Sequence, residues 1–273
     1  MSTNAMTRVA IVGIGGRMCG RIAHLTQASD DLDLVGGVEA QGHPVVGRDV
    51  GELSGSAHTG HQVVDNLENI VGTTDVVVAF TAPPDPTLAA AEICSGAGKP
   101  MVVGTTGLSD AQLETFRNTC SNIPCVFAPN YSVGVTVLTR LVEEAARILG
   151  AEYDAEIVEA HHRYKTDAPS GTALALAEAT ARGFERDLSK VGVYGRHGDT
   201  GARTAAEIGV HAMRAGDIVG EHTVMFGGIG ETVQLAHRAQ SRDTFATGVL
   251  RSIRYITGAD AGMYDMFDVL GIA

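Results

Sequence analysis

The sequence predicts an α/β fold in two parts: an N-terminal Rossmann-like domain built on a parallel sheet, and an α+β domain with a mixed sheet. Two observations support this prediction. In the first half of the chain, short apolar runs rich in β-branched residues alternate with helical segments, whereas three strand-like runs follow one another in the second half. The length of 273 residues is enough for two domains of ordinary size.

The first half alternates strands with helices. Residues 8–14 (RVAIVGI) resemble a buried parallel strand that ends in glycines, and Met18, Ile22 and Leu25 then recur at helical intervals. The same reasoning predicts strands at 32–38, 75–81, 101–103 and 125–127, and helices at 17–27, 88–95 and 110–119, the last with Ser109 as its N-cap. Such alternation indicates a parallel sheet covered on both faces, over residues 1–130.

The pattern changes after Asn130. We expect a long helix at 133–149, a strand at 155–160 and a helix at 172–184, followed by strands at 207–213, 221–226 and 231–238. Consecutive strands indicate a mixed or antiparallel sheet, and therefore a second domain over 131–240. A final helix at 244–256 is expected to return to the first domain, which the segment 241–273 completes.

Composition and charge narrow the class of protein. The formal net charge of −12 argues against a nucleic-acid partner, and no apolar run reaches the roughly 18 residues of a membrane span. Residues 1–6 lack the basic start and apolar centre of a secretion signal. The four cysteines form no Cys-x-x-Cys pair, so we expect buried reduced thiols in a cytoplasmic protein. Small anions remain open as ligands.

A glycine-rich turn follows the first strand and opens the first helix. Glycines let a backbone approach a pyrophosphate, and a helix N-terminus offers N–H groups and partial positive charge. Glu39 ends the next strand, at about the interval expected for an acid that binds ribose. These features predict a dinucleotide site, whereas the glycines alone would indicate only a tight strand–helix turn. The residues of the turn are Gly13, Ile14, Gly15, Gly16, Arg17 and Met18.

Three further residues near the predicted dinucleotide site bear on which cofactor binds there. Ala40 and Gln41 follow Glu39, and neither supplies the positive charge that a 2′-phosphate favours. We therefore expect NADH to be preferred, with NADPH possible. Cys19 stands where a third glycine could occur, and it is small enough for close helix–strand packing.

A cluster of polar residues follows the strand predicted at 155–160. His161, His162 and Lys165 lie just after it, and Ser170, Gly171 and Thr172 lead into the next helix. Because a helix start binds carboxylate or phosphate, the cluster predicts a site for an acidic small molecule. Taken singly, a histidine is more often structural and Ser-Gly-Thr is an ordinary helix cap.

The two histidines are expected to have different roles. Adjacent residues of a strand point to opposite faces, which argues against a metal site that would need both imidazoles. One would meet the reacting centre and the other would hold a substrate group. Histidine can donate a proton near neutral pH, and a nicotinamide delivers hydride, so together they would reduce a polarised C=C, C=N or C=O bond.

Five segments resemble the 4-hydroxy-tetrahydrodipicolinate reductase (dihydrodipicolinate reductase) family of lysine and diaminopimelate biosynthesis. They occur in the family's order and extend over nearly the whole chain, and the fourth is highly specific. The segments are VAIVGIGGRM (9–18), VVGTTG (102–107), APNYSVGV (128–135), EAHHRYKTDAPSGTA (159–173) and RAGDIVGEHTVMF (214–226).

The resemblance implies reduction of an unsaturated cyclic dicarboxylate, derived from aspartate semialdehyde and pyruvate, to tetrahydrodipicolinate. His161 matches the family's proton donor and Lys165 its second catalytic residue, while His162, Gly171 and Thr172, next to Ser170, match positions that hold the substrate carboxylates. A homotetramer assembled through the substrate-domain sheets is also implied. Cofactor contacts are implied at the glycine-rich turn, at Glu39, and at Gly104, Thr105, Thr106, Ala128, Pro129, Asn130 and Tyr131.

The chain departs from the family at three positions. Arginine is common in place of Ala40, glycine in place of Cys19, and some members have arginine in place of Ala82. The first difference argues against NADPH. Two alternatives stay open: a reductase of another cyclic imine or amino-acid-derived carbonyl compound, and a non-catalytic dinucleotide sensor on the same fold.

Overall fold

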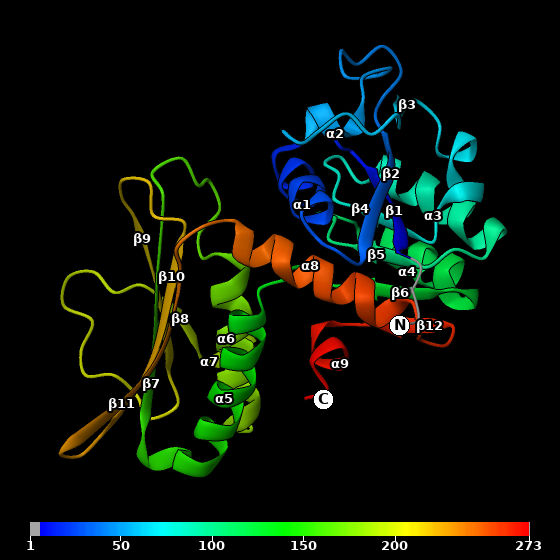
Figure 1. Cartoon of the computed structure of the whole chain (residues 1–273). Coiled ribbons are helices and arrows are strands. Elements are labelled where there is room, and N and C mark those ends of the chain that lie inside the picture. The colour runs from blue at the N-terminus through cyan, green and yellow to red at the C-terminus, as the bar shows by residue number, and fades with distance from the viewer. Residues whose placement is uncertain (1–5, 273) are drawn as a thin grey trace. The chain divides into compact units, whose positions relative to one another are not determined.

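In the computed structural model, which describes residues 6–272, six strands from the N-terminal half and one from near the C-terminus form a seven-stranded sheet (Figure 1). Every pairing in it is parallel, and its order is β3-β2-β1-β4-β5-β6-β12. The strands are β1 (Thr7–Val12), β2 (Leu32–Val38), β3 (Val63–Val64), β4 (Val76–Ala79), β5 (Met101–Val103), β6 (Pro124–Phe127) and β12 (Gly262–Tyr264).

This sheet and its helices make up the first of two units, described over 6–132 and 243–272. The helix near the C-terminus, α8, packs on α1 and on β5 and β6, so the end of the chain belongs to this unit. The helices are α1 (Arg17–Gln27), α2 (Val50–Leu53), α3 (Asp85–Ala97), α4 (Asp110–Thr119), α8 (Asp243–Ile256) and α9 (Met266–Leu270), with short 3-10 turns η1 (Leu67–Asn69), η2 (Val71–Thr73) and η3 (Cys120–Asn122).

The second unit, 133–242, contains a mixed five-stranded sheet of order β11-β10-β7-β9-β8. Strand β10 runs antiparallel to β11 and β7, whereas β9 runs parallel to β7 and to β8. Helices α5 and α6 lie side by side and pack on the sheet (Figure 1). The elements are α5 (Val133–Leu149), η4 (Gly150–Glu152), β7 (Asp154–His161), α6 (Gly171–Gly183), α7 (Leu188–Val191), β8 (Gly192–Tyr194), β9 (Ile208–Arg214), β10 (Gly220–Gly228) and β11 (Glu231–Ala239).

The predicted fold class is confirmed, and several elements have the predicted bounds. Helices α1, α4 and α5 and strand β2 begin and end where periodicity placed them, and Ser109 caps α4 in a capping box with Gln112. Helix α3 begins earlier than predicted, at Asp85 instead of Leu88. Proline is tolerated in the first turn of a helix because the N–H it lacks has no partner there, so Pro86 lies inside the helix that we expected to start after it.

Candidate active site

The residues predicted to bind a cofactor follow strands that end on the same edge of the first unit's sheet. The glycine-rich turn follows β1, Glu39 follows β2, residues 104–106 follow β5 and residues 128–131 follow β6. The strand order changes direction between β1 and β4, and open parallel sheets bind nucleotides at such a switch point.

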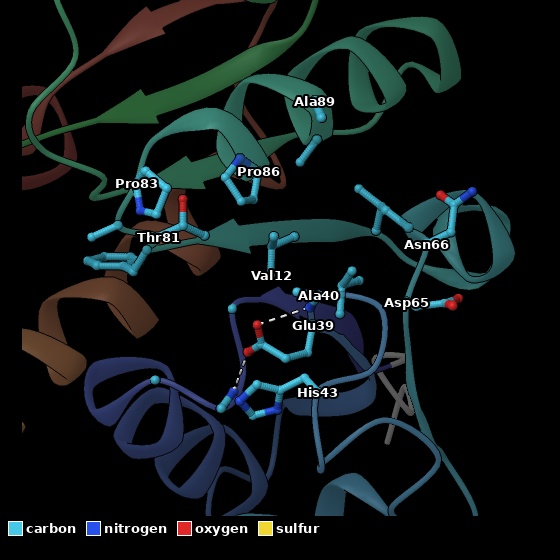
Figure 2. Close-up of a pocket in the computed structure, with 18 of the residues that line it drawn as sticks. Val12, Glu39, Ala40, His43, Asp65, Asn66, Thr81, Pro83, Pro86 and Ala89 are labelled. Carbon is cyan, nitrogen blue, oxygen red and sulfur yellow. Dashed lines mark hydrogen bonds between the residues drawn. The ribbon is translucent and has the colours of Figure 1, made fainter.

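A pocket of about 520 Å³ lies at this switch point. Gly13, Gly15 and Gly16 line it, together with Glu39 and Ala40. Figure 2 shows Glu39 beside His43 on one side, with Pro83, Pro86 and Ala89 across from them. His43 and the residues across the pocket were not among the predicted site residues, because no local pattern marks them.

The glycine-rich turn has the close approaches that its sequence suggested. Gly13 has a φ of 77°, a region that favours glycine. A Cβ on Gly15 would lie 3.0 Å from Oε2 of Glu39 and 3.0 Å from Cε1 of His43. The Glu39 carboxylate accepts hydrogen bonds from the N–H groups of Gly15 (3.0 Å) and Ala40 (3.1 Å). The turn therefore exposes backbone to the pocket and holds an acid at its rim, which fits a dinucleotide.

The other residues around the start of α1 differ in how deeply they are buried. Ile14 is buried, Met18 is half-buried and Arg17 is exposed. Cys19 packs its Sγ atom 3.5 Å from the Val12 carbonyl, and burial raises the pKa of its thiol to about 12. Like the other three cysteines it is free and buried, as predicted.

The loop after β5 supports the pocket wall. A Cβ on Gly104 would lie 2.0 Å from the Phe80 ring, so only glycine fits there without movement. The buried Thr105 hydroxyl accepts a hydrogen bond from the Thr81 N–H (2.9 Å), while Thr106 is exposed. The loop after β4, which lines the pocket, is thus anchored to the loop after β5.

The loop after β6 offers a ligand its backbone more than its side chains. Ala128 is buried, Pro129 exposed and Asn130 half-buried. The Tyr131 ring is 1% exposed, and its hydroxyl lies 2.9 Å from the Val103 carbonyl oxygen, to which it donates. Burial raises the pKa of Tyr131 well above its usual value. This ring is therefore a structural element, and a ligand contact at Tyr131 would involve its backbone.

The second group of predicted residues lies in the second unit, where β7 ends. His161 is the last residue of β7, and its Nδ1 lies 2.7 Å from Oε2 of Glu159. Glu159 is fully buried and forms an ion pair with Arg214, the last residue of β9. Burial would raise the pKa of the Glu159 carboxyl, but hydrogen bonds from Arg214 and His161 outweigh it, so the pKa is lowered and the group stays ionised.

His162 and Lys165 occupy the turn that follows. The Lys165 N–H donates to the His162 carbonyl (3.1 Å), and the Lys165 ammonium pairs with Asp167 at 2.9 Å. Nδ1 of His162 is buried and makes no hydrogen bond within residues 6–272. A buried polar atom without a partner marks unused binding capacity.

The start of α6 is connected to the same cluster through Ser170. Its hydroxyl accepts from the Ala173 N–H (3.1 Å) as the N-cap, and its own N–H donates to Glu159 (3.0 Å). Gly171 is exposed and Thr172 half-buried at the first turn of the helix. The Ser170 hydroxyl also lies 3.1 Å from Nε2 of His222, on β10.

His222 shares the buried site with His161. The two rings meet edge to face with their centroids 5.2 Å apart. Burial, followed by the nearby His161, lowers the pKa of His222 to about 4, so His222 is neutral at neutral pH. Glu159, Arg214 and His222 were missed by sequence reasoning, although all three lie within the family segments. The pairing of β7 with β9 and β10 is what places them together.

Two kinds of feature are absent from the part of the chain that the structure describes. Within residues 6–272, no group of three or more histidine, cysteine, aspartate or glutamate residues is arranged to hold a metal ion. Over the same part of the chain, no helix is both long and apolar enough to cross a membrane.

Comparison with protein families gives two adjacent matches. The model described as dihydrodipicolinate reductase, N-terminus, matches residues 7–131, and that described as dihydrodipicolinate reductase, C-terminus, matches residues 134–270. A 4-hydroxy-tetrahydrodipicolinate reductase from Syntrophobacter fumaroxidans is 47% identical over 98% of this chain and 100% of its own length. One from Chromohalobacter salexigens is 48% identical over 98% of this chain and 99% of its own length.

Solved structures agree with these matches. The dipicolinate-bound dihydrodipicolinate reductase from Paenisporosarcina sp. TG-14 has a TM-score of 0.74 and 26% identity, over 96% of this chain and 98% of that one. GenD2 from gentamicin A biosynthesis, solved in complex with NAD, has a TM-score of 0.61 and 17% identity, over 98% of this chain and 91% of that one. The second likeness concerns the fold alone.

Proposed function

Because this chain belongs to the dihydrodipicolinate reductase family, we propose that it reduces the cyclic imine dicarboxylate formed from 4-hydroxy-tetrahydrodipicolinate to tetrahydrodipicolinate, in lysine and diaminopimelate biosynthesis. The observation that carries the proposal is that one chain holds both a pocket of nucleotide-binding type at the β1/β4 switch point and the His161 cluster at the end of β7. We assign the cofactor to the first unit and the substrate to the second.

His161 is the proton donor in this proposal. A reduced nicotinamide supplies hydride to an electrophilic carbon of the substrate. His161 supplies the proton, because its Nδ1 is held by Glu159 and its Nε2 makes no hydrogen bond within the described residues. Lys165 lies in the adjoining turn, where its ammonium would stabilise negative charge on the substrate as the reaction proceeds.

The substrate carboxylates are assigned to the start of α6 and to His162. A helix N-terminus attracts anions through its N–H groups and partial positive charge, and the first residues of α6 are Gly171 and Thr172. The unused Nδ1 of His162 offers a further polar contact. Dipicolinate, which the Paenisporosarcina relative binds, is likewise a cyclic dicarboxylate.

The residues of the first unit fit a nicotinamide dinucleotide, and we propose NADH as the preferred form. Glu39 lines the pocket, and a backbone N–H group donates to each of its carboxylate oxygens. Each oxygen has a second lone pair, which would accept a hydrogen bond from a ribose hydroxyl. Ala40 lines the pocket next to it without positive charge, and a 2′-phosphate beside Glu39 would meet repulsion. We therefore expect NADPH to be used less efficiently than NADH.

We further propose that the protein is a cytoplasmic homotetramer assembled through the sheets of its second units. Helices α5 and α6 pack on this sheet. Strand β10 alternates buried and half-buried side chains, and most of β11 alternates half-buried and exposed ones, as expected when one face is left for another contact. Analytical ultracentrifugation of the purified chain tests this assignment directly, since a monomer would contradict it.

A coupled assay tests the proposed reaction. The substrate is generated freshly from pyruvate and aspartate semialdehyde by a separate enzyme, and oxidation of NADH and NADPH is followed at matched concentrations. We expect rapid NADH oxidation, a higher kcat/KM for NADH than for NADPH, and tetrahydrodipicolinate as the product. Binding of NADH without turnover would instead indicate a non-catalytic sensor, and turnover only with another imine or carbonyl compound would indicate a related reductase.

A further inference from the structure

We infer that Glu159 and Arg214 are positioning residues that fix His161 in one tautomer and leave its Nε2 as the proton-donating atom, and that Gly220 keeps space open at that atom. The inference rests on the proposed role of His161. It assigns functions to three residues that do not themselves belong to the predicted site.

The Glu159 carboxylate is surrounded by donors. Oε2 accepts hydrogen bonds from Nδ1 of His161 and Nη1 of Arg214, both at 2.7 Å. Oε1 receives Nη2 of Arg214 at 2.8 Å and the Ser170 N–H at 3.0 Å. The carboxylate is fully buried, so only an ionised acid with a cationic partner can satisfy four such contacts.

This arrangement decides the tautomer of His161. An ionised carboxylate only accepts hydrogen bonds, so Nδ1 must carry the hydrogen that lies between His161 and Glu159. When His161 gives up its other proton, it remains neutral with hydrogen on Nδ1, and Nε2 is the atom that lost it. Glu159 therefore orients the ring and fixes Nε2 as the nitrogen that gives up the proton.

Arg214 is needed because Glu159 is buried. It makes a two-pronged contact with Glu159, and one of its nitrogens donates to the Asp167 carbonyl at 2.6 Å. Arg214 therefore ties the end of β9 to the turn that carries Lys165. Without its charge, a carboxylate in this position would be stabilised in the protonated form, and the tautomer of His161 would no longer be fixed.

The groups facing His161 come from every neighbouring element. Glu159 lies on its own strand, Arg214 on β9 and His222 on β10, while Lys165 lies in the turn after β7. His222 is neutral at neutral pH, so its ring closes one side of the site without adding charge. The carboxylate of Glu159 is hydrogen-bonded directly to the His161 ring.

Gly220 lies at the opposite edge of the imidazole. A Cβ built on it would come 3.1 Å from Nε2 of His161 and 3.5 Å from Cδ2. The main-chain conformation of Gly220 is not in the left-handed region, so alanine can adopt it. The methyl group would crowd the His161 ring, while Cε1 of His222, at 3.8 Å, would be in ordinary contact. A substrate that takes its proton from Nε2 needs this space.

Glu156 provides a matched control on the same strand. Its carboxylate contacts Nε2 of His211 at 2.7 Å and Arg196 at 2.9 Å, which repeats the combination of acid, histidine and arginine. It lies an odd number of residues from Glu159 and therefore on the other face of the sheet. Loss of this acid disturbs an ion pair of the same kind without touching His161.

The test compares Glu159→Gln, Gly220→Ala and Glu156→Gln with the wild-type chain in full pH–rate profiles, with thermal unfolding and NADH binding as folding controls. For Glu159→Gln we expect kcat to fall by about 10–100-fold, because a wrongly oriented His161 loses part of its effect as a general acid. We also expect the basic limb of the profile to move to lower pH by about 1 unit, because the variant lacks the negative charge beside the ring. Glu156→Gln should keep the wild-type profile. Gly220→Ala should bind NADH normally and lose about tenfold or more in kcat, because the donor atom is obstructed.

Two outcomes overturn the inference. One is a Glu159→Gln enzyme whose basic limb stays at the wild-type pH, or moves no more than that of Glu156→Gln. The other is a folded Gly220→Ala enzyme with wild-type kcat, which also decides the question if Glu159→Gln fails to fold. His161→Gln serves as the reference. If it retains full activity, the proposed function of His161 fails. If it loses activity while the Glu159→Gln and Gly220→Ala enzymes are unaffected, only the positioning is refuted.

Discussion

Replacing Ala40 by arginine should shift the enzyme toward NADPH. Ala40 is exposed at the pocket rim, next to Glu39, and its backbone N–H already donates to the Glu39 carboxylate. An arginine at this position would project its guanidinium toward the region where a ribose 2′-substituent lies in dinucleotide folds. Among the described residues that line the pocket, Glu39 and Asp65 are acidic, and their charges oppose a phosphate.

The size of the shift follows from the exposure of the site. A hydrogen bond to a charged group contributes about 1.5–3 kcal/mol, and screening at an exposed rim brings the net gain nearer to about 1–2 kcal/mol. That gain corresponds to a factor of about 5–30 in kcat/KM for NADPH. The value for NADH should change little, because NADH carries no group for the new cation to contact.

The assay is the ratio of kcat/KM for NADPH to that for NADH, measured at low and high salt. The expected increase should shrink at high salt, because the new contact is exposed. Gln41→Arg adds the same charge one residue further along, at a position that does not line the pocket, and should change the ratio less. An Ala40→Arg enzyme with an unchanged ratio would refute the placement of the ribose beside Glu39.

Three further predictions concern catalysis, packing and acid stability. Lys165→Ala should lower kcat and raise KM for the substrate together, while NADH binding, measured by fluorescence, stays normal. Gly248→Ala should destabilise the fold by about 1–3 kcal/mol in urea unfolding, because the added Cβ would lie 1.7 Å from the Tyr131 carbonyl oxygen. Gly258→Ala is the control: a Cβ there would have nothing within 4 Å, and stability should change by less than about 0.5 kcal/mol. Burial raises the pKa of Asp49, but backbone hydrogen bonds outweigh it and lower the pKa to about 2; the donors are Thr59, Glu52, Gly60 and Gly51. The unfolded value is near 3.9. The stabilisation by Asp49 is therefore present above about pH 4 and is lost as the pH falls to about 2. Asp49→Asn should therefore be less stable at pH 5 and lose less stability between pH 5 and pH 3, and an unchanged pH dependence would contradict this.

The regular part of the fold could be predicted because its signal is local. Helix α5 carries its apolar residues at helical spacing over 17 residues, and β1 and β2 are short apolar runs next to glycines. The α-helices and strands that were missed are too short to show a period: β3 has two residues, β8 and β12 have three each, α2 and α7 four each, and α9 five. Their conformation is set by the sheet edges and caps around them.

The candidate site divides in the same way. The segment from His161 to Thr172 could be identified because its residues are close in sequence. Arg214 could not be linked to Glu159, since the two are separated by 55 positions and meet only through the pairing of β7 with β9. His43 likewise reaches the pocket through the path of the loop after β2, which has no periodic pattern.

The most direct test of the proposed chemistry is a comparison of the wild-type chain with His161→Gln in the coupled assay. Glutamine can fill the space and accept or donate a hydrogen bond, but it cannot act as an acid near neutral pH. We predict rapid NADH oxidation by the wild-type enzyme and a kcat lower by about 10²–10⁴-fold for His161→Gln, with NADH binding unchanged. An unchanged kcat in the variant, or a folded wild-type protein that binds NADH and does not turn over this substrate, would contradict the assignment of His161 as the proton donor of a dihydrodipicolinate reductase.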